Sequence, residues 1–144
     1  MVELNHVGLT VTDLDASITF YCDVVGMEVV RRYPRADDAW FKTLTENSDA
    51  VVEAVMLRLG VFRLQLTRYH DGGSSGATGH AAEGGLHLCV DVDDVDAVHA
   101  ALSTAGRYHA GPVVHHEPYG SRSFYVYDPD GVPVEFVARG QSRR

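Results

Sequence analysis

Long apolar runs are nearly absent from this chain of 144 residues. The longest, such as Val51–Val52 and Ala54–Leu57, have the length of a strand, so the sequence predicts no membrane span. The first residues, Met-Val-Glu-Leu-Asn-His, hold neither the basic region nor the apolar core of a signal peptide. We therefore expect a protein that does not associate with membranes.

Positive charge is also scarce. Lys42 is the only lysine, and the formal net charge is −8. An acidic chain repels the phosphate backbone, and the only basic stretch is the short Arg143–Arg144 tail. We therefore expect no binding to nucleic acid.

Cysteine is the third rarity, with Cys22 and Cys89 far apart and outside any CxxC pair. Such residues are typical of reduced thiols, so we expect a cytoplasmic protein.

The chain has 45% hydrophobic residues, enough for an ordinary globular core. In the first half, cap candidates at Thr12–Asp15 and a stop at Gly26 delimit a helix with apolar residues at helical spacing. Alternating apolar segments predict strands over residues 3–11, 27–33, 49–59 and 61–69.

Residues 71–85 are crowded with Gly, Ser and Ala and have no periodicity, as is typical of a linker. The same order of elements then returns, with a helix over 94–105 and strands over 86–92, 108–114, 121–127 and 132–138. We therefore predict a first module over 1–70, a linker over 71–85, a second module over 86–138 and a polar tail over 139–144.

The two halves also match residue by residue. Leu4-Asn5-His6 followed by Val11–Ala16 aligns at constant offset with Gly85-Leu86-His87 followed by Val92–Ala97. This register indicates duplication of one β-α-β-β-β unit. The predicted fold class is α+β, with two βαβββ modules forming a cupped, mostly antiparallel mixed sheet.

Four polar residues occupy equivalent phases of the repeat. His6 and His87 each alternate with a uniformly apolar face, as do Gln65 between Leu64 and Leu66 and Glu135 between Val134 and Phe136. If the halves form one curved sheet, the four side chains converge on its concave side. Two imidazoles, one amide oxygen and one carboxylate leave two positions free on an octahedral ion.

A single strand histidine is more often a half-buried, hydrogen-bonded residue than a ligand, so the prediction rests on the coincidence of phase. Six other histidines match no such pattern, and we interpret them as surface or loop residues: His70, His80, His99, His109, His115 and His116.

At these residues the chain resembles the vicinal oxygen chelate superfamily, which includes glyoxalase I, methylmalonyl-CoA epimerase, extradiol dioxygenases and the bleomycin and fosfomycin resistance proteins. The resemblance covers nearly the whole chain. Its marks are the segments His6–Val11, Leu64–Leu66, Gly85–Val90 and Phe124–Gly131 leading to Glu135–Phe136.

The resemblance implies a homodimer of paired modules with a divalent metal that holds a small-molecule substrate through its oxygens. It also implies His6, Gln65, His87 and Glu135 as the metal ligands. Because glyoxalase-like and epimerase-like members place a Glu or Gln ligand where this chain has Gln65, that residue favours the lyase or epimerase branch. The ligand set suits Ni, Co, Zn, Mn or Fe alike.

The expected activity is metal-dependent isomerase or lyase chemistry through an enolate of a small carbonyl or thioester substrate. Glu135 is the first candidate for the base. Gln65 is a poor proton acceptor, and the nearest candidates for a second base are Asp49 and Glu53.

Two alternatives remain open from the sequence. One is a non-haem iron dioxygenase of the extradiol type, which would use only His6, His87 and Glu135. The other is a resistance protein that sequesters an antibiotic or toxin without turnover. An anionic substrate would need positive side chains, for which six arginines are available: Arg31, Arg32, Arg35, Arg58, Arg63 and Arg122.

Overall fold

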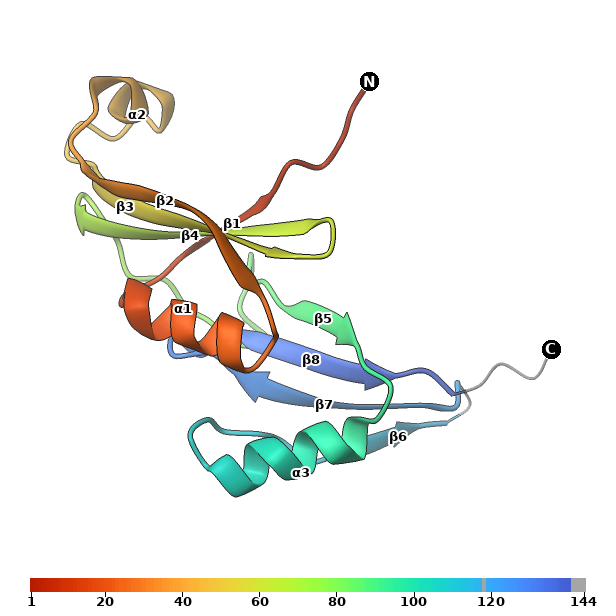
Figure 1. Cartoon of the computed structure of the whole chain (residues 1–144). Helices are drawn as coiled ribbons and strands as arrows, with labels where there is room; N and C mark the ends of the chain where they lie inside the picture. The colour runs from red at the N-terminus through yellow and green to blue at the C-terminus, as the bar shows by residue number, and fades with distance from the viewer. Residues whose placement is uncertain (118, 141–144) are drawn as a thin grey trace. The chain divides into compact units, whose positions relative to one another are not determined.

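The computed structural model describes residues 1–117 and 119–140, and the chain divides into two compact units, Met1–Gly76 and Ala77–Arg144. Each unit contains one four-stranded sheet, with strand order β1-β4-β3-β2 in the first and β5-β8-β7-β6 in the second. Figure 1 shows the strands and helices of both units. The Arg143–Arg144 tail and most of the predicted polar tail lie outside the described residues.

In the first unit, β1 (Val7–Thr10) runs parallel to β4 (Phe62–Asp71). β4 pairs antiparallel with β3 (Val51–Leu59), and β3 pairs antiparallel with β2 (Glu28–Ala36). The sheet is therefore mixed, with the first and last strands of the unit side by side.

The helix α1 (Leu14–Asp23) begins where the sequence places a cap. The Asp13 carboxylate accepts a hydrogen bond from the Ala16 backbone amide at 3.0 Å, which satisfies an amide that has no partner within the helix. α1 packs against β4, whose Leu64 and Leu66 are fully buried. Gly26 follows the helix with φ +84°, a conformation that favours glycine.

The second unit repeats this arrangement. β5 (Leu88–Asp91) runs parallel to β8 (Pro133–Ala138), β8 pairs antiparallel with β7 (Ser121–Tyr127), and β7 pairs antiparallel with β6 (Val114–His116). α3 (Val95–Ala105) is capped by Asp94, whose carboxylate accepts from the Ala97 amide at 3.0 Å. The fold class predicted from the sequence is confirmed, as two sheets of four strands.

The turn between β7 and β8 follows the Asp128-Pro129-Asp130-Gly131 sequence. The buried Asp128 carboxylate accepts hydrogen bonds from the amides of Asp130 and Val132, at 2.8 and 2.9 Å. Gly131 has φ +83°, which a residue with a side chain rarely adopts. This turn fixes where β8 starts, and with it the position of Glu135.

Three elements differ from the sequence prediction. Of the strand predicted over 3–11, only Val7–Thr10 is formed, so His6 lies directly before it. The strand predicted over 108–114 is wrong: β6 starts only at Val114, and Ala110 makes an isolated bridge to Val126. Pro112 lacks an amide hydrogen and interrupts any regular ladder there. The short helix α2 (Ala39–Leu44) was missed, because six residues are too few for a helical period to stand out.

In the described parts of the chain, none of the helices combines the length and the apolar character needed to cross a bilayer.

Candidate functional site

The register of the parallel strands is the same in both units. Gly8 of β1 is paired with Gln65 of β4, and Cys89 of β5 is paired with Glu135 of β8. His6 stands two residues before Gly8, and His87 two residues before Cys89. Each unit therefore has one histidine directly before its first strand and one oxygen donor on the neighbouring strand, in the same relation.

We call the side of the first sheet that carries Gln65 the Gln65 face. Paired residues share a face, so Met56, which opposes Gln65, lies on it, and the buried Leu64 and Leu66 point the other way. Alternation carried back from Val7 assigns His6 to the Gln65 face. Gln65 itself is half-buried.

The ring of His6 is oriented by the residue before it. Its Nδ1 lies 2.7 Å from the Oδ1 atom of Asn5. An amide oxygen only accepts, so the imidazole donates its Nδ1 proton, and the lone pair of Nε2 is left for another partner. An imidazole in this tautomer can bind a metal through Nε2.

In the second unit, Glu135 shares its face with Cys89 and Tyr125, which oppose it on the two neighbouring strands. The Tyr125 hydroxyl donates to Oε2 of Glu135 over a long 3.4 Å. Burial raises the pKa of Tyr125, and the nearby Glu135 carboxylate adds to the shift. Glu135 is therefore half-buried, with a hydroxyl directed at it.

Cys89 lies beside Glu135 on the same face of the second sheet. Burial raises the pKa of its thiol to about 11, and the charge and hydrogen bond of Glu135 contribute further. The thiol thus stays protonated at neutral pH, when it is a poor nucleophile.

The second histidine and two others lie near the rings of Tyr125 and Tyr127. His87 lies 6.1 Å from Tyr125 between ring centroids, and His80 lies 4.4 Å from the same ring on an edge-to-face approach. His80 Nε2 is also 2.7 Å from the Tyr127 hydroxyl, and His109 stacks on Tyr127 at 5.5 Å. Tyr125 lies opposite Glu135, and Tyr127, two residues further along β7, lies on the same face of the sheet.

The sequence reasoning missed this neighbourhood. His80 falls in the segment interpreted as a linker, where nothing in its flanking residues indicates a contact. Thr78 anchors that segment, because its hydroxyl donates to the Asp130 carbonyl at 2.8 Å. One sequence feature could have predicted these tyrosines near the site. Tyr125 and Tyr127 are two residues apart and alternate in phase with Glu135 across the predicted hairpin.

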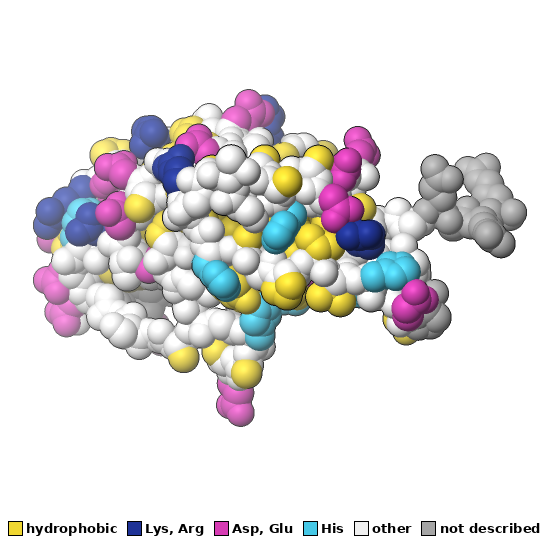
Figure 2. All heavy atoms as spheres, turned by 90° about the horizontal axis from the view of Figure 1, so that it is seen from below, with side chains coloured by type: hydrophobic (Ala, Val, Ile, Leu, Met, Phe, Trp, Pro, Cys, Tyr) yellow, Lys and Arg dark blue, Asp and Glu magenta, His cyan; other side chains and the backbone are white. Residues whose placement is uncertain are grey.

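Most other histidines of the second unit have structural partners. His99 Nε2 lies 2.9 Å from the Gly111 carbonyl, and His116 Nε2 lies 2.8 Å from the Ser123 hydroxyl. His115 Nδ1 lies 3.0 Å from a Glu117 carboxylate oxygen. Figure 2 shows histidine side chains among hydrophobic ones on one surface of the molecule.

Glu53 does not lie where a second base was predicted. It opposes Arg68 on β4, three residues from Gln65, and therefore projects from the other face of the sheet. Its Oε2 is 3.7 Å from Nε2 of the half-buried His70. The geometry gives Glu53 a neighbour of opposite charge when His70 is protonated, and no access to the Gln65 face.

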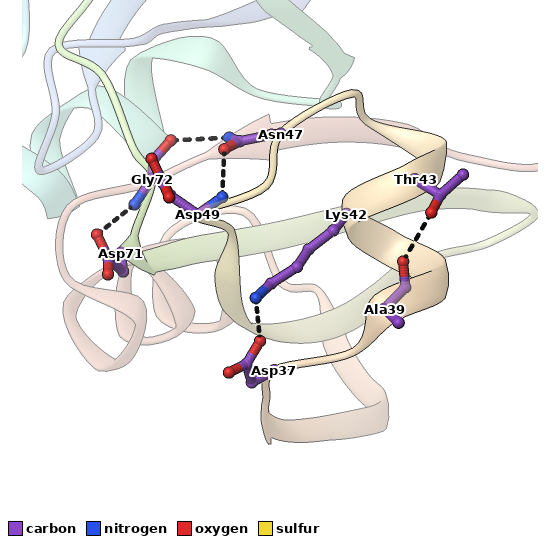
Figure 3. A network of polar contacts seen from close by, with 8 residues as sticks. All are labelled: Asp37, Ala39, Lys42, Thr43, Asn47, Asp49, Asp71 and Gly72. Carbon is purple, nitrogen blue, oxygen red and sulfur yellow. Dashed lines mark hydrogen bonds and ion pairs between the residues drawn. The ribbon is translucent and has the colours of Figure 1, made fainter.

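Asp49 lies in the loop between α2 and β3, shown in Figure 3. Its backbone amide donates to Asn47 Oδ1 at 3.3 Å, and the Asn47 side chain donates to the Gly72 carbonyl at 2.9 Å. Lys42 and Asp37 form an ion pair nearby. These hydrogen bonds hold the loop in place, and the Asp49 side chain is exposed.

The chemistry of the donors fits a divalent metal of borderline character: His6 offers a free Nε2, Gln65 an amide oxygen and Glu135 a carboxylate. Two of the predicted ligands come from each unit. Among residues 1–117 and 119–140, no three His, Cys, Asp or Glu side chains form a metal-binding group. The four-ligand set therefore stays a prediction, supported by the matching registers.

Comparison with known proteins places this arrangement in a family. The sequence profile of the Glyoxalase/Bleomycin resistance protein/Dioxygenase superfamily matches residues 3–136. The chain belongs to this superfamily.

Individual relatives are distant. The chain is 31% identical to a 2-epi-5-epi-valiolone epimerase of Actinomyces sp over 151 residues, which cover 94% of this chain and 79% of the relative. It is 28% identical to a lactoylglutathione lyase of Haemophilus influenzae over 142 residues, covering 94% and 92%. Among solved structures, a glyoxalase family protein from Bacillus cereus superposes with a TM-score of 0.78 at 21% identity, covering 97% and 95%.

Proposed function

We propose that this protein is a divalent-metal-dependent isomerase or lyase of the glyoxalase or epimerase type. The observation that carries the proposal is the identical ladder register that pairs Gly8 with Gln65 and Cys89 with Glu135. It gives each unit one imidazole and one oxygen donor in the same relation. The similarity to an epimerase and to a lactoylglutathione lyase supports the same class of reaction.

The metal would be held by His6, Gln65, His87 and Glu135. A divalent ion supplies a Lewis acid, which stabilises the negative charge that develops when a proton leaves the carbon next to a carbonyl. Gln65 contributes a neutral ligand, so the donor set carries a single negative charge, from Glu135. This leaves an excess of positive charge for an oxygen-rich substrate.

Glu135 is the proposed base. The carboxylate can accept a proton, and its neighbour Tyr125 can donate a hydrogen bond to it from the same face. Glu53 is left out of the proposal because it projects from the opposite face of its sheet. Asp49 is left out because its carboxylate is exposed in a loop.

The first test is elemental analysis of protein purified without chelator. We expect about one divalent ion per chain, lost in His6→Ala and in Glu135→Ala while circular dichroism shows an unchanged fold. No metal bound, and none taken up from Ni, Co, Zn, Mn or Fe, would contradict the proposed centre and favour a ligand-sequestering protein.

The second test concerns the chemistry. Exchange of carbon-bound protons for deuterium is followed by NMR on a panel of thioesters and hemithioacetals. Glu135→Gln should lower the exchange rate by about 10²- to 10⁴-fold, the usual contribution of a general base. The matched control is Glu117→Gln, an exposed glutamate of the same unit that pairs with His115, and it should exchange normally.

We further propose that the protein works as a cytoplasmic homodimer, as is common in this superfamily. Light scattering during gel filtration measures the mass of the particle. A mass of one chain at micromolar concentration would contradict the dimer without bearing on the metal centre.

A further inference from the structure

A cavity of about 380 Å³ opens at the end of the β3–β4 hairpin, with Arg58, Gly60 and Arg63 on its wall together with Asn5. Its volume falls within the range of small-molecule sites. All of its lining residues belong to the first unit. The hairpin turns at Gly60, whose φ of +58° favours glycine and which lines the cavity without a side chain.

The two arginines face each other directly. Arg58 of β3 is paired with Arg63 of β4 in the antiparallel ladder, so their side chains leave the same face of the sheet. Like charges placed directly opposite each other on neighbouring strands destabilise a sheet. The two arginines nonetheless lie together, in a chain whose formal net charge is −8.

Only one of the two charges is matched within the protein. Arg58 donates through Nε to Glu28 Oε1 at 3.0 Å, and a second nitrogen of the same guanidinium reaches that oxygen. In the described part of the chain, the Arg63 guanidinium has neither an ion pair nor a hydrogen bond. Glu3 also borders the cavity, and its side chain is exposed, as are those of Arg58 and Arg63.

The ladder register separates the paired arginines of this sheet into two groups. Arg58 and Arg63 lie on the Gln65 face, and so does Arg31, which opposes Met56. Arg32 opposes Val55, and Arg68 opposes Glu53, so both project from the other face. Arg63 and Gln65 are two residues apart on one strand, about 7 Å.

We propose that Arg58 and Arg63 bind an oxyanion, the carboxylate or phosphate group of the substrate, beside the predicted metal ligand Gln65. As a statement about the substrate, this rests on the function proposed above. The guanidinium of Arg63 presents paired N–H donors that match the two oxygens of such a group. The substrate would then carry its anionic group a few bonds from the carbonyl at which the reaction occurs.

The test uses the full-length chain stripped of metal by a chelator, so that it does not depend on turnover. Inorganic pyrophosphate and citrate are titrated separately, and binding is followed through the backbone amide NMR signals of residues 60–63. The first probe carries phosphate and the second carboxylate, and the tighter binder identifies the preferred group.

Arg63→Gln should raise the dissociation constant by about 10- to 100-fold, as expected for the loss of charge-assisted hydrogen bonds. Arg63→Lys, which keeps the charge and loses the planar fork, should have an intermediate effect. The matched control is Arg68→Gln, which removes an exposed arginine of the same strand from the opposite face and should change nothing.

Two results would overturn the proposal: neither probe perturbs residues 60–63, or Arg68→Gln weakens binding as much as Arg63→Gln. Because metal-free protein is used, either result leaves the proposed lyase or isomerase activity standing. Conversely, oxyanion binding in a protein that never takes up metal would leave this site intact and remove the proposed function.

Discussion

The Tyr125 hydroxyl and the Glu135 carboxylate lie 3.4 Å apart on directly opposed positions of β7 and β8. Burial raises the pKa of Tyr125, and the negative charge of Glu135 raises it further, because ionising the phenol would place two anions side by side. We expect Glu135→Gln to lower the pKa of Tyr125 towards its ordinary value.

The measurement is a titration of tyrosine ring carbons by NMR, with Tyr125→Phe used to assign the signal. Tyr33 provides an internal control, because it belongs to the other unit and should titrate at the same pH in both proteins. An unchanged Tyr125 titration in Glu135→Gln would show that the carboxylate does not act on the phenol.

Cys89 should react slowly with thiol reagents. With a thiol pKa of about 11 against an ordinary value of 9.0, its thiolate fraction near pH 8 is about 100-fold lower than that of an unperturbed cysteine. We expect the reaction rate of Cys89 in a Cys22→Ser background to rise about tenfold per pH unit up to pH 11. Adding Glu135→Gln should speed the reaction at pH 8.

The same shift has a consequence for stability. The folded protein keeps the Cys89 thiol protonated above the pH at which the unfolded chain loses that proton. Its contribution to the free energy of unfolding is therefore complete below pH 9.0 and declines as the pH rises towards 11. Cys89→Ala should therefore reduce the loss of unfolding free energy between pH 9.0 and pH 11. Urea unfolding at these two pH values measures the difference.

Asn5 is expected to tune the affinity of the metal centre. Its side-chain oxygen orients His6 and fixes the tautomer with a free Nε2. We expect Asn5→Ala to weaken metal binding by about 10- to 100-fold, the usual effect of removing such a partner. Competition with a fluorescent chelator measures the affinity. Asn47→Ala, which removes an asparagine from a loop of the same unit, should bind metal normally.

Glu53→Gln is expected to leave proton exchange within about twofold of the parent protein. Glu53 lies on the face of the sheet opposite Gln65, so it cannot reach a substrate held there. The same exchange assay measures the rate, with Glu135→Gln as the inactive reference. A loss of exchange as large as that of the reference would return Glu53 to the site.

The helix caps provide a stability test of the repeat. Asp13 and Asp94 make the same contact, accepting from the amide three residues on at 3.0 Å. Alanine at either position should lower the free energy of unfolding by about 1 kcal/mol. Asp93→Ala, which changes the exposed residue next to one cap, should cost far less, as urea unfolding will show.

Sequence patterns anticipated the parts of this fold that depend on local chemistry. The cap candidates at Thr12–Asp15 include Asp13, which caps α1, and the predicted stop at Gly26 follows that helix with a positive φ. The helix predicted over 94–105 is confirmed as α3. Period-2 alternation also anticipated that Gln65 would oppose the buried face of its strand. These features depend on residues that lie within a few positions of one another.

The parts that were missed depend on contacts between distant segments. The position of Glu53 on the opposite face follows from an antiparallel register that no local pattern reveals. His80 reaches Tyr127 only because Thr78 fixes its segment to the β7–β8 turn. Likewise, the six available arginines looked equivalent until the ladder placed Arg58 opposite Arg63.

The parallel pairing of β1 with β4, and of β5 with β8, has a consequence for folding. Each pair joins the opening strand of a unit to its closing strand, so the ligands of the predicted metal centre approach each other only after the whole unit is formed. A metal ion that binds to these ligands would then stabilise the folded state more than the transition state for folding. It would slow unfolding far more than it speeds folding.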